Sequence, residues 1–280
     1  MRSRAPLSLD VAMLAVSASL YAVGSMLTEY TASPWGIGQF RPAVVFPTVF
    51  AILFGPWVGG LGAAIGTFVA AMLTNGNVPL SLMAGVPGNF VGFFVLGYLA
   101  SKFSWRRFAW VTVLSLLIGN VVAGLGVVWY LSAFVGWPSP LSVRGMAIAL
   151  GLTSWWLITM LPFEFVAVPP ILKALWRAFP SLAERSSPKD DGLGPKSILL
   201  SLGIPGGAMT AFGFFLWLNP TVALLMMSGL HNPAEFVAAT TMMFFLGGLA
   251  LVATGATLSV YFSRPGRRPV PSSGNTATSE

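Results

Sequence analysis

The feature that most constrains this chain is the alternation of long apolar runs with short polar connections, in which basic residues occupy every second connection. Of the 15 Lys and Arg residues in the 280-residue sequence, thirteen fall on one set of alternate connections and two on the other. About 20 apolar residues are needed to cross the hydrocarbon core of a bilayer, and Lys and Arg concentrate in cytoplasmic loops. The pattern predicts an all-α, polytopic membrane helix bundle with a fixed orientation.

Apolar length divides the chain into eight predicted membrane segments. They cover residues 11–30, 42–54, 56–74, 80–101, 108–131, 145–172, 197–218 and 236–262. With a cytoplasmic N-terminus, this count leaves only Arg41 and Arg144 outside. The basic residues inside are Arg2, Arg4, Lys102, Arg106, Arg107, Lys173, Arg177, Arg185, Lys189, Lys196, Arg264, Arg267 and Arg268. The split predicts an N-in, C-in topology in the cell membrane.

Composition excludes several classes of protein. Only 8% of the residues are charged and 55% are hydrophobic, whereas about a quarter of a soluble domain is charged. The net charge of +7 therefore indicates topology and contact with anionic lipid, and not nucleic-acid binding. The absence of Cys and the single His, His231, exclude thiolate sites and argue against a metal centre. We expect no metal and no cofactor.

Two segments are unsuited to simple crossing. Residues 42–54 form a predicted helix of about 20 Å at about 1.5 Å per residue, which is shorter than the bilayer core. Residues 79–90 place two prolines, two glycines and an Asn at the start of the fourth segment. Short or Gly/Pro-interrupted membrane segments are the best sequence indication of a transporter binding site. A proline kink between packed helices is the alternative for each.

Small residues recur at four-residue spacing in two segments. Residues 55–66 contain seven small residues in such an arrangement, which lets another helix approach closely. A similar stripe in the first predicted helix consists of Ala15, Ala18, Ser19 and Ala22. That stripe suits internal packing or the docking of a partner subunit, and spacing alone favours internal packing.

Three runs of this sequence, FRPAVVFP at 40–47, FGPWVG at 54–59 and GNFVGF at 88–93, resemble the membrane-embedded substrate-binding (S) components of energy-coupling factor (ECF) transporters. The resemblance covers about residues 8–175. It implies a six-helix, vitamin-binding core whose site lies near the extracellular side, under the loops between helices one and two, three and four, and five and six.

The resemblance further implies how such a subunit works. It binds a small-molecule substrate without hydrolysing anything, pairs with a transmembrane coupling subunit and two ATPases, and topples in the membrane to release its substrate inward. Small residues on the first helix mediate docking, and here Ala15, Ala18, Ser19 and Ala22 match them. The chain departs from the pattern by adding two predicted membrane helices after the six-helix core. We therefore divide it into a core (1–175), a cytoplasmic linker (176–196), two further membrane helices (197–263) and a disordered tail (264–280).

Polar and aromatic residues at the predicted outer end supply the candidate binding site. They are Glu29, Trp35, Gln39, Arg41, Asn75, Asn77, Asn89, Trp137 and Arg144. The two outside arginines suit an anionic ligand group, and Trp35 or Trp137 suits stacking on a ring. The alternative for each is ordinary: an interfacial Trp anchors a helix, an Arg near a helix end snorkels, and Asn89 can bond across helices, as can Asn120.

Glu164 is an acidic residue inside the sixth predicted segment, where ionisable groups are rare and usually functional. We expect a structural ion pair with Arg106 or Arg107, with a proton relay as the alternative. Coupling of Glu164 to protons would favour a self-sufficient secondary transporter over an ECF importer. A membrane-embedded enzyme is the third class, and the lack of a GxxxxGK loop, paired acidic ligands or a His cluster argues against it.

Overall fold

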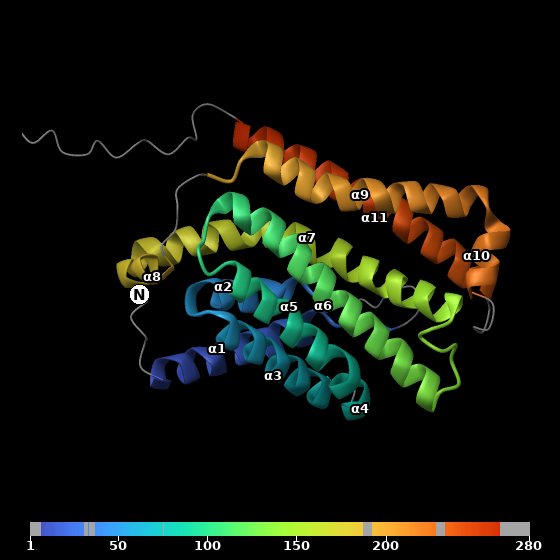
Figure 1. Ribbon diagram of the computed structural model, residues 1–280, viewed down its shortest axis with the longest axis horizontal. Coiled ribbons are helices and arrows are strands. Elements are labelled where there is room, and N and C mark those ends of the chain that lie inside the picture. Colours follow the sequence, from blue (N-terminus) through green and yellow to red (C-terminus); the bar gives the residue numbers. More distant parts are fainter. Residues whose placement is uncertain are drawn as a thin grey trace, which may run out of the picture.

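The computed structural model shows a bundle of α-helices (Figure 1). It describes residues 7–30, 33, 37–74, 76–186, 192–227 and 233–263. In chain order the elements are α1 (Leu7–Thr28), the 3₁₀ turn η1 (Pro42–Val44), α2 (Val45–Phe54), α3 (Pro56–Thr74), α4 (Val78–Leu80), the π-helical turn η2 (Ser81–Gly85), α5 (Val86–Leu99), α6 (Trp105–Phe134), α7 (Val143–Ala178), α8 (Pro180–Ser186), α9 (Pro195–Leu218), α10 (Pro220–Met227) and α11 (Pro233–Ser263).

Within the described residues, seven helices are long and apolar enough to cross a membrane. One of them is the composite unit Val78–Leu99, which joins α4, η2 and α5, and the apolar segment Pro42–Phe54 is shorter. The prediction of an all-α, multi-pass membrane bundle is confirmed. Each of the eight predicted segments coincides with a helix or helical unit, and the number of crossings and their direction stay predictions.

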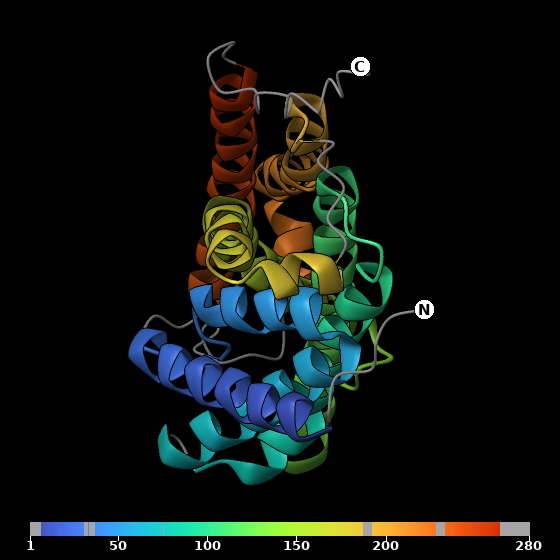
Figure 2. The same ribbon diagram turned by 90° about the vertical axis from the view of Figure 1, so that its left-hand side faces the viewer.

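The helices lie in three rough layers (Figure 1). Helices α9 and α11 pair along one side, α6 and α7 cross the middle, and α1, α3 and α5 form the opposite side. Figure 2 shows α9 and α11 on the far side of α7 from α1. The short α2 is enclosed by α1, α3, α5 and α7, so most of its side chains are buried in protein.

Glycines in α3 determine how closely its neighbours approach. A Cβ added to Gly59 would lie 2.3 Å from the Cβ of Ala51 in α2, and one added to Gly66 would lie 2.7 Å from the carbonyl oxygen of Ala18 in α1. Gly60 faces α5 in the same way, 3.0 Å from the Cβ of Phe94. Contacts this close exclude any larger side chain. The small-residue run of the sequence is therefore a packing surface for three helices.

The C-terminal helices α9 and α11 form an antiparallel pair held by glycines. A Cβ added to Gly206 would lie 2.8 Å from the carbonyl oxygen of Gly248, and one added to Gly213 would lie 2.4 Å from the backbone nitrogen of Phe245. The pair meets the rest of the bundle through contacts of α11 with α7 and of α9 with α6. Gly247, for example, faces the side chain of Ile158 in α7.

The connection between α7 and α9 is more ordered than a plain linker. Helix α7 continues to Ala178, and α8 follows as a separate short helix that contacts α2 and α7. The indole Nε1 of Trp176 donates to the Ser186 hydroxyl at 2.9 Å. Residues 187–191 of the predicted linker and the predicted disordered tail from residue 264 onward lie outside the described residues.

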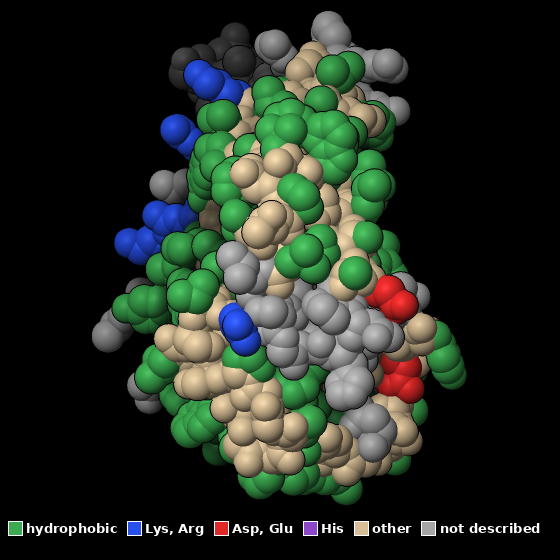
Figure 3. Space-filling view, turned by 90° about the vertical axis from the view of Figure 1, so that its right-hand side faces the viewer, with side chains coloured by type: hydrophobic (Ala, Val, Ile, Leu, Met, Phe, Trp, Pro, Cys, Tyr) green, Lys and Arg blue, Asp and Glu red, His purple; other side chains and the backbone are tan. Residues whose placement is uncertain are grey.

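Basic side chains gather at one end of the bundle. The α5–α6 connection, the end of α7 and the start of α9 lie at the same end as the start of α1 in Figure 1, and they carry Lys102, Arg106, Arg107, Lys173, Arg177 and Lys196. Figure 3 faces the opposite end, where the described surface around the central grey area is mostly hydrophobic or uncharged. The arrangement agrees with the charge pattern from which the cytoplasmic end was predicted.

Candidate functional site

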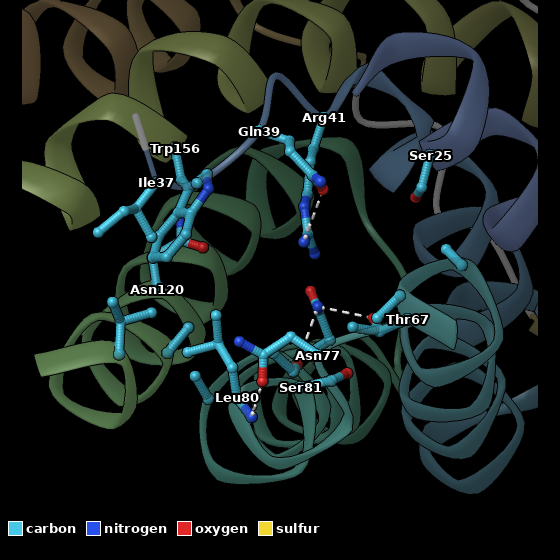
Figure 4. Close-up of a pocket in the computed structure, with 18 of the residues that line it drawn as sticks. Ser25, Ile37, Gln39, Arg41, Thr67, Asn77, Leu80, Ser81, Asn120 and Trp156 are labelled. Atoms are coloured by element: carbon cyan, nitrogen blue, oxygen red, sulfur yellow. Dashed lines mark hydrogen bonds between the residues drawn. The ribbon is translucent and has the colours of Figure 1, made fainter. Parts of the chain in front are cut away.

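A polar cavity lies inside the bundle between α1, α3, the α4–η2–α5 unit, α6, α7 and residues 37–41 (Figure 4). Its volume is about 100 Å³, below the roughly 300–1,000 Å³ of sites for drug-sized ligands. The polar residues that line it are Ser25, Gln39, Arg41, Thr67, Asn77, Ser81, Asn89 and Asn120. Ile37, Val127, Trp156 and Met160 provide larger apolar surfaces.

Arg41 directly precedes the short apolar segment that contains α2, and it lines the cavity. Gly97, near the end of α5, approaches Pro56 so closely that an added Cβ would lie 2.7 Å from its Cα, so α2 ends level with the end of α5. The segment Pro42–Phe54 rises only about 20 Å, which is less than the thickness of a hydrocarbon core of about 30 Å. Arg41, directly before it, is among the residues that line the cavity.

Asn89 joins three helices beside the cavity. Its amide Nδ2 donates to the Thr67 hydroxyl of α3 at 2.8 Å and to the carbonyl oxygen of Gly85 at 3.0 Å. Its Oδ1 accepts from the hydroxyl of Tyr21 in α1, a fully buried side chain, at 3.2 Å. Asn89 thus holds α1, α3 and α5 in fixed relation, in agreement with the expected cross-helix bonding.

The interrupted fourth segment forms the floor of the cavity in Figure 4. Asn77 caps α4 by accepting from the backbone nitrogen of Leu80 at 3.1 Å, and its amide donates to the hydroxyl of Tyr130 at 3.2 Å. The π-helical turn follows at once, and its residues Ser81 and Gly85 line the cavity. Such turns often occur at functional sites because they redirect side chains.

Four buried polar atoms of the cavity wall have no hydrogen-bond partner among the described residues. They are the hydroxyls of Ser25 and Ser81, Nε of Arg41 and Nε1 of Trp156. Ser25, Ser81 and Trp156 are at most 6% exposed. A buried donor or acceptor left unsatisfied costs about 1–3 kcal/mol, so the wall of this cavity carries polar groups whose burial is not compensated among the described residues.

Residues 37–41 cover the cavity beside Trp156. Gly38 has φ +84°, and an added Cβ would lie 3.0 Å from the indole ring of Trp156. Two hydrogen bonds from Ser33 hold this segment. The backbone nitrogen of Ser33 donates to the carbonyl oxygen of Gly38 at 2.8 Å, and its hydroxyl donates to the carbonyl oxygen of Ile37. Three residues further on, Arg41 points into the cavity and donates to Gln39 Oε1 at 3.4 Å (Figure 4).

The structure brings together four of the nine predicted site residues, namely Gln39, Arg41, Asn77 and Asn89. Glu29 does not line the cavity. Trp137 and Arg144 line a separate, open surface hollow at residues 136–144. These three residues therefore do not line the cavity with the other four, and Trp35 and Asn75 lie outside the described residues.

The predicted docking stripe of the first helix is divided between two faces. Ala15 and Ser19 are exposed, whereas Ala18 and Ala22 are 7% and 4% exposed. Ala18 lies against Gly66 of α3. Of the four residues, only Ala15 and Ser19 are on the exposed face of α1, because the protein itself covers the other two, and docking stays a prediction.

Glu164 is fully buried, and it accepts a hydrogen bond from the hydroxyl of Thr48 in α2 at 2.7 Å. The expected ion pair with Arg106 or Arg107 was wrong, because both arginines are exposed while Glu164 turns inward. Arg107 instead donates to the carbonyl oxygen of Lys102. Glu164 follows Trp156 by two helical turns, so it lies on the same face of α7, beyond the cavity.

Sequence reasoning missed Ser25, Thr67, Ser81 and Trp156. Ser and Thr are common in membrane helices, where their hydroxyls usually bond to the carbonyl of the preceding turn, so their presence alone indicates no site. The available signal for Trp156 was its place in mid-segment, away from the interfaces where Trp normally anchors a helix.

Comparisons of the chain with models of known protein families, with curated proteins and with solved structures found no match.

Proposed function

We propose that this protein is the membrane-embedded, substrate-binding subunit of an ECF-type importer for a vitamin or similar small micronutrient. The observation that carries the proposal is the small polar cavity enclosed by apolar helices, with four unpartnered polar atoms in its wall. Polar groups within a bilayer are costly, and they mark substrate pathways. The likeness of residues 8–175 to S components supports the proposal.

In this proposal the chain binds its ligand and performs no chemistry. A separate transmembrane coupling subunit and two ATPases supply the energy, and the protein carries no cofactor or metal. Docking of the coupling subunit uses the exposed face of α1 that contains Ala15 and Ser19. Replacing Ala15 with Leu should then reduce co-purification of the coupling subunit and leave ligand binding intact.

The test begins with the full chain purified in mild detergent. We expect a small molecule to co-elute in about stoichiometric amount, to be identified by mass spectrometry, and to enter proteoliposomes only when the coupling subunit, the ATPases and ATP are present. Uptake by the chain alone would exclude the importer subunit. A preparation that neither retains nor rebinds any small molecule would exclude a binding role.

A second candidate, a self-sufficient secondary transporter, is favoured by one observation. Glu164 is a fully buried carboxyl group on the face of α7 that also lines the cavity, and its Oε2 has no partner among the described residues. Intramembrane carboxyl groups often act in proton relays. Proteoliposomes containing only this chain should then accumulate ligand in response to a pH gradient, and E164Q should abolish the accumulation.

A further inference from the structure

We infer that the cavity recognises a small monoanionic carboxylate attached to a planar ring, with the carboxylate at Arg41 and the ring beside Trp156. This inference rests on the proposed binding function and specifies the class of its ligand. Inside the cavity, the cationic side chain of Arg41 lies near an apolar wall that contains Trp156.

The charge of the cavity selects the charge of the ligand. Arg41 is the one charged residue among the described residues that line it, and its described hydrogen-bond partner, Gln39, is neutral. A guanidinium enclosed among apolar helices is costly unless it is paired. A single carboxylate would match both its charge and its planar fork of donors, whereas a cationic ligand would meet no acidic side chain among the described lining residues.

The two walls differ in chemistry. In Figure 4 Trp156, Ile37 and Asn120 lie on one side of Arg41, and Ser25 and Thr67 lie on the other. Met160 extends the apolar wall and receives a weak hydrogen bond from the amide of Asn120 at 3.6 Å. This wall suits a ring.

The volume restricts the ligand to a compact molecule. A cavity of about 100 Å³ is smaller than the engineered apolar cavity of roughly 150 Å³ that binds benzene. This volume favours a ligand with a single ring over a larger one.

The experiment uses three probes that share one ring and differ in charge: benzoate, benzamide and benzylamine. Binding to the full chain in lipid nanodiscs is measured by calorimetry. We expect benzoate to bind about tenfold or more tightly than the other two. R41Q should weaken benzoate binding about tenfold, and R41K should weaken it less, because Lys keeps the charge but loses the fork.

R144Q is the matched control, since Arg144 is exposed in a separate hollow; it should leave benzoate binding unchanged. Equal binding of benzamide or benzylamine, equal effects of R41Q and R144Q, or no binding of benzoate at millimolar concentration would each overturn the inference. The wild-type comparison needs no variant, so it holds even if R41Q misfolds.

The two proposals fail differently. A neutral or cationic co-eluting molecule, with benzoate excluded, would refute the carboxylate site and leave the importer proposal standing. Arg41-dependent binding of benzoate without ATP-dependent uptake would do the reverse.

Discussion

At the scale of single residues, Gly38 controls where Arg41 is held. Its backbone has φ +84°, and a Cβ added to it would lie 3.0 Å from the indole of Trp156, which would have to move by a few tenths of an ångström. Both conditions favour glycine, because other residues rarely adopt this conformation. The position of the guanidinium therefore depends on a residue that itself has no functional group.

Replacing Gly38 with Ala should weaken binding of the co-eluting ligand several-fold, since a non-glycine residue in the left-handed region costs about 1–2 kcal/mol and the added Cβ displaces Trp156. Calorimetry on the purified protein measures the effect. The control is Gly136→Ala, which has a similar φ of +80° but nothing within 4 Å of the added atom. Equal losses in both variants would show that Trp156 contact is irrelevant.

Replacing Asn89 with Leu should destabilise the protein by about 1–3 kcal/mol, because it leaves the buried hydroxyl of Tyr21 without its acceptor. Thermal unfolding in detergent, without ligand, provides the measurement. Asn219→Ala is the control, since that amide bonds only to the carbonyl of Phe215 at an exposed helix end. An unchanged melting temperature for Asn89→Leu would show that the hydrogen bonds of Asn89 to α1 and α3 do not stabilise the protein.

At the scale of elements, the π-helical turn η2 is positioned by the glycine opposite it. A Cβ added to Gly126 of α6 would lie 2.2 Å from the carbonyl oxygen of Met83. The backbone of η2 therefore rests directly on α6, and the cavity floor cannot move without moving that helix.

Gly126→Ala should lower the melting temperature and weaken ligand binding together, because it separates η2 from α6. Its control is Gly203→Ala in the middle of α9, where nothing lies within 4 Å of the added atom; this change should be neutral or stabilising, since Ala favours helix by about 1 kcal/mol over Gly. A neutral Gly126→Ala would contradict the tight contact.

The helices were predictable because apolar length and loop charge report directly on bilayer crossing. The short α2 and the broken fourth segment were also visible in the sequence, and they led to Arg41 and Asn89. Loop composition does not reveal where a loop folds, and Trp137 and Arg144 line a hollow separate from the cavity. Ala18 and Ser19 are adjacent in sequence, yet only the rotation of α1 about its axis decides which is buried.

At the scale of the whole molecule, the cavity lies among α1, α3, the α4–η2–α5 unit, α6 and α7, and the α9–α11 pair lies outside it. Every described residue that lines the cavity lies between Ser25 and Met160. The C-terminal pair contacts α6 and α7 from outside, so its contribution to binding is indirect.

A chain truncated after Ser187 should insert and bind the same ligand with an affinity within a few-fold of the full chain, although with a lower melting temperature because Gly247 and its neighbours no longer cover Ile158. Calorimetry and thermal unfolding on both lengths provide the comparison. An inserted fragment that cannot bind would make α9 and α11 part of the functional unit.

Because the sequence contains no Cys, single-cysteine labelling can test the predicted orientation without background. Ser139→Cys should react with a membrane-impermeant maleimide on intact cells, whereas Lys102→Cys should react only after permeabilisation. The reverse pattern would invert the bundle and place Arg41 near the cytoplasm.

The shortness of α2 has a consequence for biogenesis. A segment of this length is a poor stand-alone substrate for insertion, so we expect α2 to enter the membrane as a hairpin with α3, joined at the Gly55–Pro56 turn and held by the contact of Gly59 with Ala51. The Thr48 hydroxyl can form its hydrogen bond to Glu164 only after α7 has been synthesised, because Glu164 lies more than 100 residues downstream. We therefore expect α2 to complete its contacts only after α7 has been synthesised, although it inserts early with α3.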